Sequence, residues 1–485
     1  MPRTRLWIGW IAGLGCFIPG LFWAHSFNVY GAGLLMAFEA LSMSFAGFLT
    51  PNSRDYTSSD SSGHNPSNIN LLSKLARPAT FVSAFSVSEA VRMTWPFGGL
   101  PIGGVFLGQA SSPLLNSARI GGPLLLTALV WALGAGLSIL MVPLIKVARG
   151  SLYSDPLQPT LSRSNLLVGV YIVLLVVGLC VAGWLSPEGH PTGRELSVAS
   201  VQGGGKRGFS KEQVNPETVF AAQLSATSQI PTLDHSHTPD LILWPEDVIS
   251  LAGQLQGSWQ ANVMSNLAST MHTTIVAGVT STISSTSFLN EAVVWGPNGK
   301  IIGHYEKVHR VPFGEYVPYR GFFKHFANLS AVPLDAVPGH GTGLLDTPAG
   351  ALGTMISFEV FFANRSLPSV RAGAQVLIVP TNTSSYATTQ IPTQEVAADK
   401  IQAVQTGRYL IQAAPAGYST VVNDQGKVLD QSVLGHRQVL LARVPLLTGS
   451  TIFVRIGQWP ILGLMIFILI LGWIQPIRHR TKKRS

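Results

Sequence analysis

Cysteine is nearly absent from this chain, which has only two among 485 residues. Both of them, Cys16 and Cys180, lie inside long apolar segments, so the region between residues 190 and 450 contains no thiol. Two cysteines in separate segments exclude a disulfide framework and a cysteine-rich zinc site. A cysteine nucleophile is excluded throughout the region without thiols.

Charged residues are also scarce, at 11% of the chain against about 25% in a typical soluble protein. The mean hydropathy is +0.32, and both values indicate a membrane protein. The net charge of +9 could suggest a nucleic-acid partner, but the basic residues form no single patch beside aromatic residues. Many of them flank apolar segments, which is typical of cytoplasmic loops. We therefore expect a membrane partner and no nucleic acid.

Several segments approach the roughly 20 apolar residues that a membrane span needs. They are residues 6–24, 28–49, 80–95, 121–145, 165–185 and 454–474. The first lacks a cleavage site and is interpreted as a retained helix. Segment 80–95 is the weakest because it contains Glu89 and Arg92, which at one helical turn's spacing can pair with each other. The alternative for it is an amphipathic helix at the membrane surface.

Basic residues predict the orientation of the chain, because loops rich in Lys and Arg stay in the cytoplasm. Such residues gather around Arg54, around Arg149 and in the tail after Arg478. Counting crossings between them places residues 190–450 outside the cytoplasm, provided that 80–95 crosses. The predicted domains are a helical bundle (1–186), a linker (187–217), an extracytoplasmic catalytic domain (218–450) and a last span with a basic tail (451–485).

Between residues 218 and 450, short apolar runs alternate with helix-compatible stretches. The runs predict buried strands at 241–244, 274–277, 292–295, 352–356, 376–379 and 409–413. Helices are expected at 253–270 and 391–407, and hairpin turns at 297–300 and 423–426. Interleaved strands and helices predict a layered α/β domain.

Three motifs that follow or end strands carry the candidate chemistry. They are Trp244-Pro245-Glu246, the run from Tyr305 to Pro318, and Ile356-Ser357-Phe358-Glu359. Acyl transfer needs a nucleophile, a base, and a cation or hydrogen-bond donors for the oxyanion.

Each candidate residue is matched to one of these roles. Glu246 is a candidate base, since an apolar setting raises a carboxyl pKa, and Lys307 a candidate oxyanion partner, with the backbone near Phe358 as a further donor. Glu315 and Glu359 could orient Lys307 and relay protons. The alternatives are structural. Glu246 and Lys307 could form a buried ion pair, and Glu315 and Glu359 could be polar residues that only support the fold.

The order Glu, Lys and nucleophile resembles the Glu-Lys-Cys site of the nitrilase superfamily. The run Phe313-Gly314-Glu315-Tyr316-Val317-Pro318, together with the upstream string from Arg92 to Pro101, resembles one membrane-embedded branch, the apolipoprotein N-acyltransferases. In that family about two further spans precede the first one seen here.

The resemblance implies an αββα sandwich on a transmembrane helical bundle in the bacterial inner membrane. It also implies a two-step reaction. An acyl chain passes from the sn-1 ester of a phospholipid to the enzyme, and then to the amino group of a lipoprotein's diacylglyceryl-cysteine. It implies no metal and no organic cofactor, and we expect a monomer.

Ser357 departs from the family, which has cysteine at this position. A thiol has a pKa of about 8.5, whereas a serine hydroxyl depends on an adjacent base. Three interpretations follow: a natural serine enzyme, an inactive homologue that binds lipid or lipoprotein, and an engineered Cys→Ser variant. The other candidate positions are intact, which favours the serine enzyme. A carbon–nitrogen hydrolase (amidase) is a further alternative, and Phe358 replaces a tyrosine common in the family.

Overall fold

The computed structural model describes residues 2–51, 71–148, 163–205, 214–233, 238–325 and 328–482. The chain forms two compact units, one of Met1–Ser186 with Gln458–Ser485 and one of Pro187–Gly457. Arg54 and Arg149, which entered the orientation argument, lie outside the described residues.

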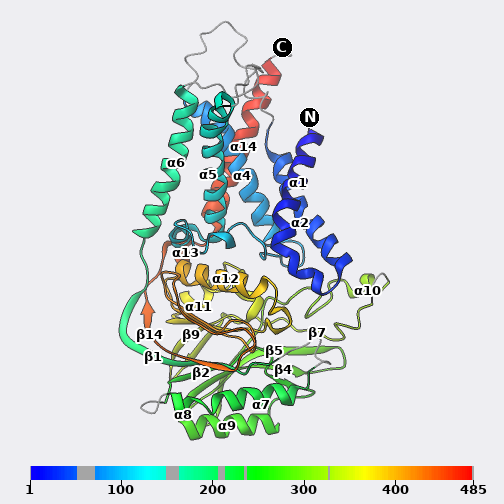
Figure 1. Cartoon of the computed structure of the whole chain (residues 1–485), viewed down its shortest axis with the longest axis vertical. Coiled ribbons are helices and arrows are strands. Elements are labelled where there is room, and N and C mark those ends of the chain that lie inside the picture. The colour runs from blue at the N-terminus through cyan, green and yellow to red at the C-terminus, as the bar shows by residue number, and fades with distance from the viewer. Residues whose placement is uncertain are drawn as a thin grey trace. The chain divides into compact units, whose positions relative to one another are not determined.

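The first unit is helical (Figure 1). Its elements are α1 (Pro2–Leu21), η1 (Phe22–Ser26), α2 (Val29–Leu49), α4 (Leu71–Arg92), η4 (Leu107–Gln109), η5 (Leu115–Ser117), α5 (Ala118–Ala148), α6 (Arg163–Trp184) and α14 (Trp459–Lys482). Four stretches are long and apolar enough to cross a membrane: Arg3–Ser26, Val29–Leu49, Leu115–Met141 and Asn165–Trp184. They confirm four of the predicted segments as span candidates.

The other two predicted segments differ from the prediction. Segment 80–95 falls largely within α4, which is not among the four candidate spans in the described part of the chain. The last segment is a shorter apolar helix, Trp459–Ile474. Its predicted first residues instead form α13 (Ile452–Ile456) of the second unit, capped by Thr451.

Helices α1 and α2 approach each other closely through glycines. A Cβ on Gly9 would lie 2.5 Å from the Met43 carbonyl oxygen, and one on Gly13 would lie 2.7 Å from the Ala40 Cα. Small residues at the interface between two membrane helices allow such close contact between their backbones.

The weak segment contains a buried ion cluster that the sequence indicated only in part. Arg92 Nη2 lies 2.7 Å from Glu89 Oε1, so the predicted pair is confirmed, and Arg92 Nη1 lies 3.2 Å from Glu39 Oε2. The guanidinium also donates to the backbone carbonyls of residues 100–102. Two carboxylates and three carbonyls thus satisfy one arginine in an apolar helical unit.

Replacing Arg92 by methionine is expected to lower the free energy of unfolding by about 3–5 kcal/mol, because two buried carboxylates lose their cation. The thermal unfolding midpoint of the detergent-solubilised protein measures this loss. Adding Glu39→Leu and Glu89→Leu should restore most of it. An unchanged midpoint in Arg92→Met would contradict the prediction.

The second unit contains two sheets. Its strands are β1 (His190–Gln202), β2 (Leu241–Leu243), β3 (Ile249–Leu251), β4 (Thr274–Thr282), β5 (Ser287–Trp295), β6 (Ile301–Glu306), β7 (Asp335–Ala336), β8 (Leu344–Thr347), β9 (Gly350–Thr354), β10 (Val376–Pro380), β11 (Leu410–Ala413), β12 (Thr420–Val422), β13 (Val428–Gln431) and β14 (Gln438–Thr448). One sheet has the order β14-β1-β2-β4-β5-β6, with β3 on β4 and β7 on β5, and the other has the order β13-β12-β11-β10-β9-β8.

The helices of this unit are α7 (Pro216–Thr227), α8 (Ile230–Leu233), α9 (Trp259–Met271), α10 (Arg320–Phe323), η7 (Ser357–Phe361), α11 (Leu367–Arg371), η8 (Ser384–Tyr386), α12 (Ile391–Thr406) and α13. Figure 1 shows α7, α8 and α9 on the outer face of one sheet and α11 and α12 on the outer face of the other. One apolar core joins the two sheets, for example through Leu243 and Ile378. A second core joins the first sheet to α7 and α9, for example through Trp244 and Met264. The predicted layered α/β fold is therefore confirmed as an αββα sandwich.

The six predicted strands and both hairpin turns are confirmed. Strand β2 reads as a continuous apolar run because both of its faces are buried. Both predicted helices form, but α9 begins at Trp259 because the Ser258 side chain caps it. Helix α12 ends before Gly407, whose φ of +65° closes the helix.

The predicted linker at 187–217 is wrong in its first part. Residues 190–202 form strand β1, which pairs with β14 on one side and with β2 on the other. The error arose because the first half of β1 is exposed and rich in charge, Gly and Pro, while only its second half is buried. Residues 206–213 lie outside the described part.

Candidate active site

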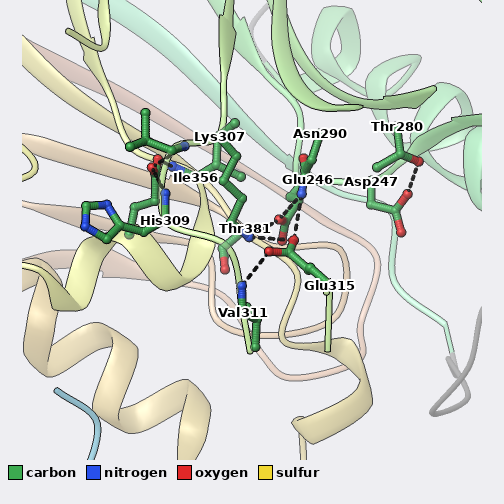
Figure 2. Close-up of polar contacts among 12 residues, drawn as sticks. Glu246, Asp247, Thr280, Asn290, Lys307, His309, Val311, Glu315, Ile356 and Thr381 are labelled. Carbon is green, nitrogen blue, oxygen red and sulfur yellow. Dashed lines mark hydrogen bonds and ion pairs between the residues drawn. The ribbon is translucent and has the colours of Figure 1, made fainter. Parts of the chain in front are cut away.

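Glu246 lies in a tight turn after β2. Its backbone N–H donates to the Thr381 carbonyl at 3.3 Å. Gly278 on β4 lies against this turn, since a Cβ there would fall 2.4 Å from the Glu246 Cα. The next residue, Asp247, has a φ of +55°, and the Thr280 hydroxyl donates to its carboxylate at 2.5 Å (Figure 2). The backbone on both sides of Glu246 is thus fixed.

Gly278→Ala is expected to displace Glu246, because the new methyl group would overlap backbone atoms that cannot rotate away. Such overpacking costs about 1–3 kcal/mol and moves the carboxylate. The rate of acyl-enzyme formation should therefore be affected more strongly than the free energy of unfolding. The matched control is Gly253→Ala, because Gly253 has open space around it. Equal rates in the two variants would contradict the prediction.

Lys307 directly follows β6 and is buried, with 2% of its surface exposed. Its Nζ lies 2.8 Å from Glu246 Oε1 and 2.9 Å from Glu315 Oε1. Asn290 Nδ2 donates to the same two oxygens, at 2.8 and 2.9 Å. Figure 2 shows these four side chains converging from β5 and from the residues that follow β2 and β6.

Glu315 is held by the loop that follows Lys307. Its Oε2 accepts from the Val311 N–H at 2.8 Å, and its own N–H donates to the Val311 carbonyl at 2.8 Å. The loop therefore closes on itself and directs Oε1 at the ammonium. Glu315 is eight residues from Lys307 along the sequence. Only the turn at Val311 brings the two side chains together.

The electrostatics of the cluster favour a fixed cation beside a basic carboxyl. Burial raises the pKa of Glu246, the Lys307 ammonium opposes this rise, and the Glu315 carboxylate adds to it. Burial opposes the charge on Lys307, but Glu246 and Glu315 outweigh it and hold the pKa of the ammonium above its usual value. Glu246 Oε1 takes both hydrogen bonds, while Oε2 takes none among the described residues. One carboxylate oxygen is thus left to accept a proton.

Ser357 begins η7 at the sharp turn after β9. Its φ of +50° is the left-handed conformation, which is unusual for a residue with a Cβ. A strained residue at a strand-to-helix turn is how several hydrolase folds present a nucleophile. Ser357 is half-buried. Its hydroxyl makes no hydrogen bond to Glu246, to Lys307 or to any other described residue.

Glu359 does not join the ammonium cluster. Its carboxylate is fully buried and accepts from the backbone N–H groups of Val308, His309 and Ile356 at 2.8, 3.0 and 2.8 Å. It also accepts from the Tyr305 hydroxyl at 2.8 Å. This one carboxylate therefore ties the residues after Lys307 to the residue before Ser357. Within the described ranges it makes no contact with the Lys307 ammonium.

Phe358 is buried and packs edge-to-face on Phe362, with ring centroids 4.9 Å apart. One group of described residues has metal-ligand spacing, namely Glu291, His304 and Glu306 on β5 and β6. None of the predicted site residues belongs to that group, and the candidate chemistry uses no metal ligand.

Comparison with known proteins agrees with this geometry. Residues 198–451 match the family model for carbon–nitrogen hydrolases, and residues 1–136 match the model for the N-terminal domain of apolipoprotein N-acyltransferases. The apolipoprotein N-acyltransferase of Azotobacter vinelandii is 26% identical over 507 residues, covering 100% of this chain and 89% of that relative. The Shewanella oneidensis protein of the same name is 26% identical, covering 96% and 86%.

The chain belongs to the apolipoprotein N-acyltransferase family. The predicted family is thereby confirmed. Among solved structures, Nit3 of Saccharomyces cerevisiae, a member of the nitrilase superfamily, is 20% identical with a TM-score of 0.40, covering 52% of this chain and 90% of that chain. Family membership and the four candidate spans make this a membrane protein with a nitrilase-like domain.

Sequence reasoning assigned no role to two groups that this site uses. Asn290 bonds both carboxylates of the cluster, and Tyr305 bonds Glu359. Asn290 is a buried amide on β5, just ahead of the apolar run that begins at Ala292, and a buried polar group needs partners. That signal was present in the sequence, but its partners come from distant segments.

Proposed function

We propose that this protein transfers an acyl chain from a phospholipid to the N-terminal amine of a diacylglyceryl-cysteine lipoprotein, through an acyl-enzyme on Ser357. The unit of residues 187–457 is the catalytic domain, and it works on the extracytoplasmic face of the bacterial inner membrane as a monomer. Family membership supports lipid and lipoprotein substrates, and the ammonium cluster supports the chemistry.

In the first step, Ser357 Oγ attacks the carbonyl carbon of the phospholipid ester. The hydroxyl proton passes to Glu246, whose raised pKa suits a base. Lys307 and the backbone N–H groups near Phe358 stabilise the negative carbonyl oxygen. The ester C–O bond then breaks, the proton moves from Glu246 to the departing alkoxide, and a lysophospholipid leaves.

In the second step, the lipoprotein's free amine attacks the ester on Ser357. Glu246 takes a proton from the attacking nitrogen, and Lys307 again faces the oxyanion. The bond between Ser357 Oγ and the acyl carbon breaks, and Glu246 returns the proton to Oγ. The products are an amide and the free enzyme, so no other reactant is needed.

The observation that carries this proposal is the buried ammonium of Lys307, shared by two carboxylates and flanked by a Glu246 oxygen that has no hydrogen-bond partner among the described residues. Ser357 makes no hydrogen bond to its proposed base, but such contacts commonly tighten only when substrate binds.

Serine in place of cysteine makes the acyl-enzyme an oxygen ester. An oxygen ester is less reactive toward an amine than a thioester, so we propose that the second step limits turnover. The left-handed backbone at Ser357 is a strained conformation of the kind found at functional sites and supports a role as nucleophile. Intact Glu246, Lys307 and Glu315 favour an active enzyme over an inactive lipid-binding homologue.

Mass spectrometry tests the proposal directly. Purified protein is incubated with phospholipid and a diacylated lipopeptide, and the expected result is a gain of one acyl chain on the peptide amine. With phospholipid alone, an alkali-labile ester should appear on the peptide that contains Ser357. Ser357→Ala should show neither product.

Ser357→Cys separates the remaining interpretations. Activity in this variant without activity in the parent would indicate an inactive homologue and would refute the serine mechanism. Acyl release to water rather than to the lipopeptide amine would instead indicate a hydrolase. A faster second step in Ser357→Cys than in the parent is the expected result, because a thiolate leaves more readily than an alkoxide.

A further inference from the structure

A second pair of carboxyl groups is buried in the α/β unit, on helix α12. Glu395 and Asp399 are 1% and 0% exposed, and their spacing of four residues places them on one face of the helix. Glu395 Oε1 accepts from the Thr381 hydroxyl at 2.5 Å, and Asp399 Oδ2 accepts from the Thr420 hydroxyl at 3.1 Å. Their other oxygens, Oε2 and Oδ1, have no partner among the described residues.

No cation forms an ion pair with either carboxyl group among the described residues, although the Lys307 ammonium acts on Glu395 from farther away. Helix α12 packs against η7, β11, β12 and α13, whose titratable groups are Glu359 and Arg455. Glu359 is occupied by Tyr305 and by backbone N–H groups, and Arg455 is exposed. No ion pair involves Glu395 or Asp399 in the described ranges. An ionised carboxylate buried without a cation is strongly unfavourable, so such groups keep their protons.

The protonation of the pair follows the same reasoning. Burial raises the pKa of Glu395 to about 8, the nearby charge of Glu246 adds to the rise, and the hydrogen bond from Thr381 and the Lys307 ammonium oppose it. Burial and the Glu395 charge raise the pKa of Asp399 well above its usual value. At pH 7 Glu395 is therefore mainly a neutral acid, and the pKa of Asp399 is shifted in the same direction.

Thr381 connects this pair to the site. It follows β10, is fully buried, and its N–H donates to the Ala413 carbonyl at 2.9 Å. Its carbonyl accepts from the Glu246 N–H at 3.3 Å, and its hydroxyl donates to Glu395. Only Thr381 therefore lies between the Glu395 side chain and the backbone of Glu246, the proposed base.

We propose that Glu395 is a positioning residue for acyl transfer, which as a neutral acid fixes Thr381 and, through it, the backbone at Glu246. This inference rests on the proposed function for the reaction that it serves. Glu395 touches neither substrate nor the reacting atoms. A full negative charge on Glu395 would instead act on a cluster in which Glu246 and Glu315 already share the single ammonium of Lys307.

Lysophospholipid release in a single turnover tests the positioning. Glu395→Ala should slow it by about tenfold to a hundredfold, since small displacements of a catalytic group have effects of this size. Glu395→Gln keeps an oxygen that accepts from Thr381 and should stay within about twofold of the parent, as a neutral isostere. Thr393→Ala, at an exposed position of the same helix, is the matched control.

Two further measurements do not depend on acyl transfer. The first is the rate at which iodoacetamide alkylates the thiol of Ser357→Cys, read by mass spectrometry, which should slow with Glu395→Ala and not with Glu395→Gln. The second is the unfolding midpoint against pH. Unfolded Glu395 ionises near 4.5 and folded Glu395 near 8, so the folded state loses stability between these values as pH rises. Glu395→Gln should remove that part of the slope.

The outcomes are distinct. If the parent protein releases no lysophospholipid, the proposed function is refuted. The alkylation rate and the pH dependence of the unfolding midpoint then still test the positioning role of Glu395. Unchanged alkylation in Glu395→Ala, with only a lower midpoint, means a purely structural role and overturns it. Glu395→Gln as impaired as Glu395→Ala, or a pH slope equal to the parent's, overturns it as well.

Discussion

Lys307→Met is expected to slow acyl-enzyme formation by about 10²–10³-fold, because the oxyanion loses its buried cation. The same change leaves Glu246 and Glu315 without their shared ammonium, although Oε1 of each still accepts from Asn290. Breaking a buried ion pair by removing one partner costs about 3–5 kcal/mol of unfolding free energy. The loss should therefore appear both in the rate of lysophospholipid release and in the unfolding midpoint.

The control for this prediction is Lys300→Met, since Lys300 is exposed in the hairpin turn between β5 and β6. It should keep the parent's rate and midpoint. Adding Glu246→Leu and Glu315→Leu to Lys307→Met should recover stability without recovering activity. A Lys307→Met protein with the parent's rate would remove the proposed oxyanion role.

Glu246→Gln is expected to slow acyl-enzyme formation by about 10³-fold, within the range that general-base catalysis supplies. The amide oxygen of glutamine can still accept from Lys307 and Asn290, so the fold and the midpoint should change little. In this variant the rate should therefore fall while the unfolding midpoint changes little. In Lys307→Met both should fall. The exposed Glu217 supplies the control, Glu217→Gln.

The pH dependence gives an independent check on the base. Only ionised Glu246 can accept a proton, and burial moves its pKa above the 4.5 of an ordinary glutamate. The parent's rate of lysophospholipid release should therefore rise with pH through an apparent pKa above 4.5. This acidic limb should be absent from the residual rate of Glu246→Gln. The same limb in both proteins would show that another group is the base.

The α/β layers could be predicted from local sequence patterns. Runs such as Leu241–Leu243 are apolar on both faces, and this is a property of short segments that can be counted along the chain. Strand β1 escaped the same reasoning because its first half is polar and exposed. Its place in the sheet depends on pairing with β14, about 240 residues later. Pairing over such distances leaves no local mark.

For the candidate site, the sequence determined the residue types and their order, namely Glu246, Lys307, Glu315 and Ser357. Tertiary structure decided how they are grouped. Glu315 reaches the ammonium through the turn at Val311, while Glu359 turns away from it to bind backbone N–H groups. Burial and hydrogen bonding between distant segments set these outcomes, as they do for Asn290 and Glu395, because side-chain partners depend on three-dimensional packing and not on spacing along the chain.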